Sequence, residues 1–137
     1  IHSIIPLIFI IYFLSSLITI NSVSTSQNFD DARNSQRSSD VLQILNAVTQ
    51  YTSEQGNLLL DLGDIAYCNE RITQIGSGSG NVDLASKLVP DYISDIPTDP
   101  SGGTAQNTGY TICEEPTGKV RISAPNSDNN QNITVLR

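Results

Sequence analysis

The side chains in this chain that could do acid–base chemistry are carboxylates in three small groups. Two carboxylates at a suitable distance can act as general acid and general base. The groups are Asp61 with Asp64, Asp91 with Asp95 and Asp99, and Glu114 with Glu115. The only histidine, His2, lies in the apolar beginning of the sequence, which excludes a histidine-based triad or histidine-ligated metal site in the remainder. We therefore interpret the carboxylates as solvated surface, and expect no enzyme and no cofactor.

Two further motifs concern an ion and a modification. Asp95 and Asp99, beside the glycine pair at 102–103, could hold a calcium ion together with backbone carbonyls. The alternative is again solvated surface. Residues 132–134 form a sequon in which Asn132 accepts a glycan where the host has the enzymes, and otherwise Asn132 is a strand-edge asparagine.

The chain has two cysteines, Cys68 and Cys113. In an exported chain, an even number of cysteines favours a disulfide. This bond would close a loop of about 45 residues and contribute roughly 4 kcal/mol in the chain-entropy model. The alternative is two free buried thiols.

Charge divides the chain into two parts. Every Lys, Arg, Asp and Glu lies at or after Asp30, so the net charge of −7 belongs wholly to the second part. Such an acidic surface disfavours nucleic acid and anionic lipid headgroups as partners. We expect residues 1–29 to form an apolar transmembrane or filament-core helix with a polar linker, and residues 30–137 to form one globular domain.

The first 20 residues, IHSIIPLIFIIYFLSSLITI, carry no acidic or strongly basic side chain. A secretory signal peptide has a basic region before its apolar stretch and a small-residue cleavage site after it, and this segment has neither. Because the sequence holds no methionine, we expect that processing removed a leader and left the segment on the mature chain. Its apolar length is at the short end for a membrane-spanning helix, so a plain single-pass anchor is an alternative.

Residues 30–55 have the pattern of an amphipathic helix. Apolar side chains recur at three- and four-residue spacing and form one stripe that must bury against another part of the chain: Val41, Ile44, Leu45, Val48 and Tyr51. The polar side chains that we expect largely off this stripe are Arg33, Arg37, Asp40, Gln43 and Gln50. Gly56 and Asn57 then end the helix.

The remainder predicts loops and a sheet. Residues 56–107 form a loop region between helix and sheet, with a short helix expected at 81–93. Alternating apolar side chains and a type I turn at 115–118 predict an antiparallel sheet within residues 108–137, with strands at 109–115, 119–124 and 132–136. A small sheet that covers the helix stripe gives an α+β domain.

Two sequence motifs, together with the order of the segments described above, give the chain a resemblance to a known family. They are R-x-S-D-V-x-Q-I-x-x-A-V-x-x-Y at Arg37–Tyr51 and YI-x-x-IP-x-DP at Tyr92–Pro100. Together with the uncharged apolar beginning, they make nearly the whole chain resemble the type IV pilin and type II secretion pseudopilin family. The resemblance implies a lollipop-shaped subunit, whose long N-terminal helix is apolar in its first half and packs on a small antiparallel sheet with its amphipathic second half.

The resemblance also implies a life cycle. A prepilin peptidase removes a short leader, the apolar helix holds the subunit in the cytoplasmic membrane, and an ATP-driven assembly machinery extrudes it into a helical filament. The apolar helices then bundle in the filament core. The implied core residues are Ile4, Ile5, Leu7, Ile8, Phe9, Ile11, Phe13, Leu14, Leu17 and Ile18.

Two features depart from the family pattern. Members typically begin with an N-methylated Phe and carry a Glu at the fifth mature position, whereas this chain has Ile1 and Ile5. Members also often have a helix-breaking Gly or Pro near the end of the apolar segment, while here residues 21–28 could melt through weak helix propensity alone. Some minor, tip-located members lack the glutamate, but the small size favours the repeating subunit.

The sequence therefore predicts a structural subunit of an extracellular filament at the cell surface. The expected partners are copies of the chain, minor pilins, the assembly machinery and, before assembly, the cytoplasmic membrane, with no nucleic acid. One alternative is a minor or tip pseudopilin of a secretion system. Another is a single-pass membrane-anchored surface binding domain that stays monomeric.

Overall fold

A computed structural model describes the backbone of residues 5–137 and the side chains of residues 25–137. The chain divides into two compact units, residues 1–32 and residues 33–137. The elements are α1 (Ile5–Ser53), the 3-10 helix η1 (Leu59–Leu62), β1 (Thr73–Gln74), α2 (Ala85–Leu88), β2 (Thr111–Glu114), β3 (Val120–Ser123), the 3-10 helix η2 (Asp128–Asn130) and β4 (Thr134–Leu136).

The first unit contains the first part of α1. The helix includes residues 21–28, where weak helix propensity would allow melting. The expected filament-core side chains, from Ile4 to Ile18, lie outside the described residues, so their role stays a prediction.

In the second unit, four strands form an antiparallel sheet in the order β1-β2-β3-β4. The predicted turn joins β2 and β3, where the Gly118 N–H donates to the Glu115 carbonyl at 2.8 Å. Gly118 has φ +89°, a conformation that favours glycine. The expected third strand is present as β4, and the two-residue strand β1 at the other edge was not expected.

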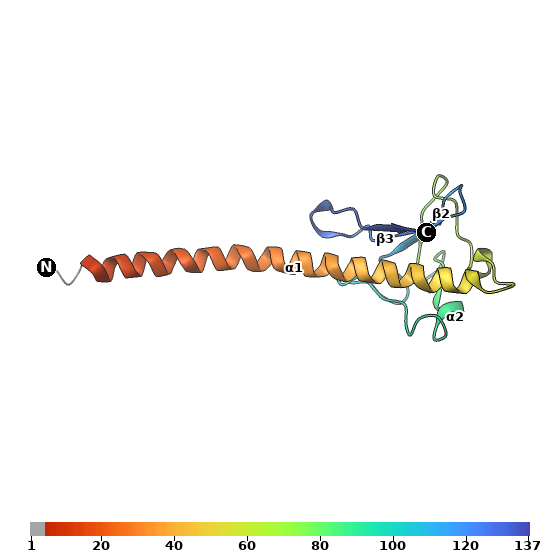
Figure 1. Cartoon of the computed structure of the whole chain (residues 1–137), viewed down its shortest axis with the longest axis horizontal. Helices are drawn as coiled ribbons and strands as arrows, with labels where there is room; N and C mark the ends of the chain where they lie inside the picture. The colour runs from red at the N-terminus through yellow and green to blue at the C-terminus, as the bar shows by residue number, and fades with distance from the viewer. Residues whose placement is uncertain (1–4) are drawn as a thin grey trace. The chain divides into compact units, whose positions relative to one another are not determined.

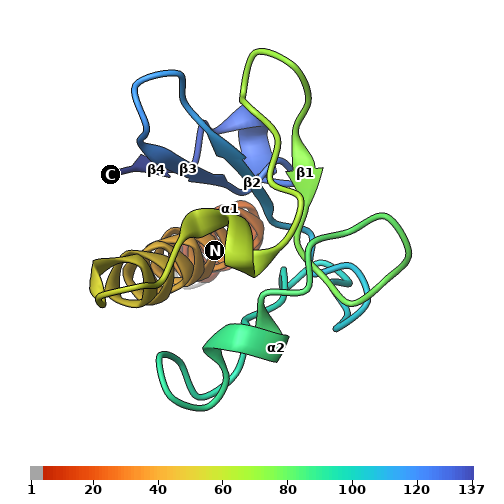
Figure 2. The ribbon, with the colours of Figure 1, turned by 90° about the vertical axis from the view of Figure 1, so that its right-hand side faces the viewer.

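The second part of α1 packs on this sheet, and the fold is α+β (Figure 1). Figure 2 shows the sheet on one side of α1 and α2 on the other. The predicted stripe is in the core, with every member at most 7% exposed: Val41, Ile44, Leu45, Val48 and Tyr51. It is joined there by fully or almost fully buried side chains from the sheet and the loops, among them Ile75, Leu84, Leu88, Ile112 and Ile122.

The helix expected over residues 81–93 is shorter than predicted. Only Ala85–Leu88 form α2, because Val89 has extended backbone angles (φ −95°, ψ 135°). Val89 precedes Pro90, and a residue before proline is disfavoured in the helical region by the proline ring. Leu88 is nevertheless buried, so this short turn still contributes an apolar anchor.

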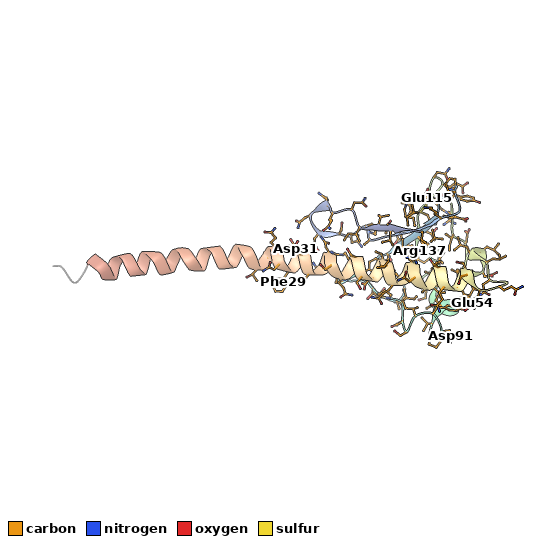
Figure 3. The ribbon with its side chains drawn as sticks, viewed as in Figure 1. Phe29, Asp31, Glu54, Asp91, Glu115 and Arg137 are labelled. Atoms are coloured by element: carbon orange, nitrogen blue, oxygen red, sulfur yellow. A yellow bond between two sulfur atoms is a disulfide. The ribbon has the colours of Figure 1, made fainter. Side chains whose placement is uncertain are left out.

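Contacts at two places hold further segments to the second part of α1 and to Glu54, which directly follows it. The Tyr92 hydroxyl donates to the Glu54 carboxylate at 2.5 Å, and the rings of Tyr92 and Tyr51 pack edge to face with their centroids 5.3 Å apart. At the chain end, Arg137 donates to the Asn46 side-chain oxygen at 3.0 Å. Figure 3 labels Glu54 and Arg137 in these two places.

Candidate functional site

The largest fully buried polar side chain in the second unit is Arg37 of α1. Its guanidinium binds both carboxylate oxygens of Asp99 (Nε–Oδ2 2.8 Å, Nη2–Oδ1 3.1 Å) and one oxygen of Asp128 (Nη1–Oδ2 2.7 Å). It also donates to the Asn34 side-chain oxygen at 2.9 Å and to the Ser101 hydroxyl at 2.8 Å. All five N–H donors of the guanidinium are thereby used, which is the condition for burying an arginine without a large penalty.

Asp128 is shared between two arginines. Arg33, one helical turn before Arg37, binds its two carboxylate oxygens at 2.8 and 3.0 Å. Asn34 adds a reciprocal pair, accepting from the Asp128 backbone N–H at 2.9 Å and donating to its carbonyl at 3.0 Å. We refer to Arg33, Asn34, Arg37, Asp99 and Asp128 as the arginine cluster. It fixes the loop before β2, through Asp99, and the loop before β4, through Asp128, to the same face of α1.

A second polar contact lies one turn further along α1. The buried Tyr110 hydroxyl donates to one oxygen of Asp40 at 2.5 Å, and Gln36 donates to the other at 2.7 Å. Asp40 is 2% exposed, and both of its oxygens are hydrogen-bonded. The contact connects α1 to the start of β2.

The electrostatics of this region favour fixed charges. The hydrogen bond to Asp99 is the main cause that raises the pKa of Arg37 above its usual value. Hydrogen bonds from Arg33 and then Arg37 hold the pKa of Asp128 well below its usual range. Burial, followed by the contact with Asp40, raises the pKa of Tyr110. At neutral pH these groups keep their charge states, so the arrangement suits holding segments together and is poorly suited to proton transfer.

The expectation that Arg37 and Asp40 lie off the apolar stripe is wrong, because both are buried. Arg37 stands four residues before Val41, and Asp40 stands four residues before Ile44. Residues with this spacing share a helix face. Extending the stripe by one turn toward the N-terminus would therefore have found both side chains.

The interpretation of Asp99 as solvated surface is wrong, because this residue is 3% exposed, and its environment also differs from the calcium site that the sequence suggested. Its two oxygens accept from Arg37, and Oδ1 also accepts from the Ser101 backbone N–H at 2.8 Å. A neighbouring guanidinium opposes a second cation at the same carboxylate. Asp95 instead accepts from the Ile96 backbone N–H at 2.9 Å. Among the residues described with side chains, no group of three or more His, Cys, Asp or Glu could hold a metal.

The other carboxylate groups take part in local contacts. Asp61 accepts from the Leu58 backbone N–H at 2.8 Å at the start of η1. Asp64 forms an exposed ion pair with Arg71 at 2.5 Å. Exposed pairs of this kind contribute little to stability.

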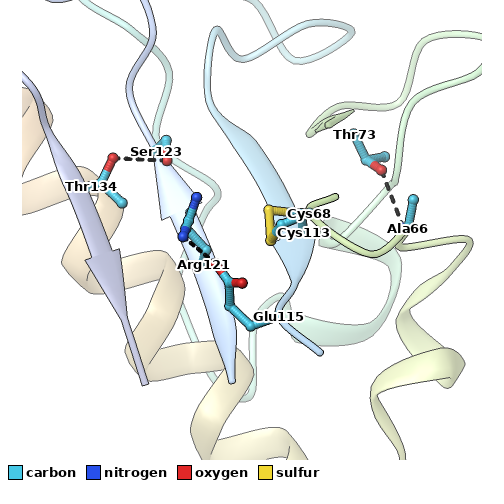
Figure 4. Close-up of a disulfide and its surroundings, with 8 residues drawn as sticks. All are labelled: Ala66, Cys68, Thr73, Cys113, Glu115, Arg121, Ser123 and Thr134. Carbon is cyan, nitrogen blue, oxygen red and sulfur yellow. Dashed lines mark hydrogen bonds and ion pairs between the residues drawn. A yellow bond between two sulfur atoms is a disulfide. The ribbon is translucent and has the colours of Figure 1, made fainter. Parts of the chain in front are cut away.

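Cys68 and Cys113 form a disulfide, as predicted, with their Cα atoms 4.9 Å apart. Figure 4 shows that it connects the loop before β1 to the central strand β2. The Cys68 backbone N–H also donates to the Glu114 carbonyl at 2.8 Å. An ion pair between Glu115 and Arg121 lies close by on the β2–β3 hairpin. The irregular segment before β1 is therefore held to the sheet by both covalent and polar contacts.

The sequon ends at Thr134, the first residue of β4. Asn132 is exposed, and the Thr134 hydroxyl donates to its side-chain oxygen at 3.1 Å. The acceptor asparagine is thus accessible from solvent, and its glycosylation stays a prediction.

No family model, no curated protein and no solved structure matches this chain. Within residues 25–137, no helix has the length and apolar character needed to cross a membrane. The apolar segment at residues 1–20 lies outside that range.

Proposed function

We propose that this chain is the structural subunit of a type IV pilus-like filament and polymerises through its apolar segment, residues 1–20. The observation that carries the proposal is the two-part character of α1, Ile5–Ser53. Its first part falls in an uncharged apolar sequence, and its last part is buried against the sheet of the second unit. The apolar sequence needs an apolar environment, which a membrane supplies before assembly and copies of the same segment supply afterwards.

The second unit supports this proposal because its disulfide and its arginine cluster would keep it folded on the outside of a filament. A disulfide persists in an oxidising environment outside the cell. The arginine cluster attaches two loops to α1 with charge-assisted hydrogen bonds, which are stronger than neutral ones. Under the proposal, the apolar helices form the filament core, and the second units face the solvent in the pilin-like lollipop arrangement.

A shearing experiment with two matched variants tests the proposal. Leu7→Asp places a charge in the apolar segment, whereas Leu60→Asp places one at a side chain of η1 that is already 72% exposed. Material sheared from cells that produce the wild type or Leu60→Asp is expected to sediment on centrifugation. Electron micrographs of the pellet are expected to show thin fibres. Leu7→Asp is expected to give none, because a charge in an apolar helix bundle is costly.

Two other results would identify the alternatives. Chain that stays with the membrane and dissolves only in detergent, as a monomer, would show an anchored surface domain. Labelling by antibody at fibre ends alone would show a minor or tip subunit. Either result contradicts the proposal of a repeating subunit.

A further inference from the structure

A hollow of about 230 Å³ opens beside α2 in the second unit, and it is lined by apolar side chains and by carboxylates. Its apolar side includes Ile75, Leu84 and Ile96, which are at most 9% exposed. Asp83 and Asp95 also line it, and both are exposed. Pockets for drug-sized ligands measure about 300–1,000 Å³. The hollow is therefore better matched to one inserted side chain than to such a ligand.

The lining indicates what kind of side chain would fit. Lysine has a four-carbon apolar stem that packs on apolar surface and an ammonium head that stays near water or a carboxylate. The buried side chains suit the stem, and the two exposed carboxylates suit the head. The hollow thus has the chemistry of a lysine acceptor.

Few cations of this chain are available to fill it. Each of the five arginines already contacts an acceptor in its own chain: Arg33, Arg37, Arg71, Arg121 and Arg137. Within residues 25–137, the ammonium groups of Lys87 and Lys119 have no hydrogen bond or ion pair. Lys87 belongs to α2, which lines the hollow itself, and is exposed.

Lys119 has a different place in the fold. It follows the β2–β3 turn, where residues 116–119 are all exposed. The sheet that carries this turn and α2 lie on opposite sides of α1 in both views (Figures 1 and 2). The hollow is also lined by Thr108, which precedes the start of β2, whereas Lys119 follows the turn after the end of β2, so the two lie at opposite ends of this strand. Filling the hollow with Lys119 requires a second copy of the chain.

We propose that Lys119 of one copy inserts into the hollow of the next copy, with its ammonium group beside Asp83 and Asp95. The proposal rests on the filament function proposed above and adds the contact between the second units. The two surfaces differ, so the interface is heterologous, and a heterologous contact that does not close into a ring repeats as a helical filament. Copies with a net charge of −7 repel one another, and placing a free cation at an acidic rim reduces that repulsion where they meet.

The direct test is zero-length cross-linking of fibres assembled from a mixture of isotopically light and heavy full-length chains. A water-soluble carbodiimide joins an amine to a carboxylate only when they are in contact. The expected product, found by mass spectrometry after digestion, joins Lys119 of one isotope to Asp83 or Asp95 of the other. Fibres that yield no such product overturn this inference and leave the filament function standing. Absence of fibres overturns the filament function and this inference together.

Charge-reversal variants give a second readout. Lys119→Glu and Asp83→Lys are each expected to lower the yield of sheared fibre by about tenfold, and the double variant to recover much of it, because the reversed pair attracts again. Arg71→Glu is the matched control, with the same charge change at a side chain that is 49% exposed and pairs with the exposed Asp64, and about wild-type yield is expected. Wild-type yield from Lys119→Glu, or an equal loss from Arg71→Glu, overturns the inference.

Discussion

Replacing Arg37 by methionine is expected to lower the free energy of unfolding of the second unit by about 3–5 kcal/mol. Methionine retains an unbranched apolar stem but removes all five hydrogen bonds of the guanidinium. The Asp99 side chain is 1% exposed, so its carboxylate would remain buried without the opposite charge. Domains of this size are stable by only about 5–15 kcal/mol, so the loss is a large share of the total.

Two further variants separate this effect from a general loss of charge. Arg33→Met removes an arginine that is 35% exposed and binds the partly exposed Asp128, so a cost of about 0.2–1 kcal/mol is expected. In Arg37→Met/Asp99→Leu, no buried charge is left alone, and part of the loss should be recovered. The coupling between the two positions is expected to be about 0.5–3 kcal/mol.

The assay is urea unfolding of the full-length, oxidised chain in mild detergent, followed by far-ultraviolet circular dichroism. The chain has no tryptophan, and tyrosine fluorescence gives the second probe that a two-state analysis requires. The reasoning is refuted if Arg37→Met costs no more than Arg33→Met. It is also refuted if the double variant is less stable than the sum of the two single changes predicts.

Two more predictions concern the second unit. Replacing Cys68 and Cys113 by serine removes a covalent link between residues 45 apart in the sequence. The chain-entropy model predicts that this lowers the free energy of unfolding by about 4 kcal/mol. Urea unfolding measures the change, and a loss below about 1 kcal/mol contradicts the model. Arg33 and Arg37 hold the pKa of Asp128 below its usual value. The stability advantage of the wild type over Asp128→Asn is therefore fully present above the unfolded-state pKa of about 3.9 and shrinks as the pH falls below it. Urea unfolding at about pH 7 and about pH 3 tests this, and an advantage that is the same at both contradicts the assignment.

The features that could be predicted from the sequence are those set by local patterns. The stripe from Val41 to Tyr51 follows from helical spacing alone. The β2–β3 hairpin follows from alternation on either side of a turn that contains Pro116 and Gly118. The disulfide follows from there being only two cysteines in the chain.

Helical spacing could have placed Arg37 on the buried face, but it could not have identified the partners of Arg37, which lie far away in the sequence. Arg37 contacts Asp99 and Asp128 at separations of 62 and 91 residues, which no local spacing encodes. Its burial is possible only because those carboxylates meet it. β1 has two residues, Thr73 and Gln74, and so is too short for an alternating pattern. It is a strand because it pairs with β2.

The most direct test of the account is a cryo-electron microscopy reconstruction of the sheared fibres. A pilus-like filament would be a helical assembly of this chain, with residues 1–20 packed together along the axis and the units formed by residues 33–137 at the surface. A fibre in which residues 1–20 lie outside the core, or sheared material that holds no fibre containing this chain, would contradict the proposed function.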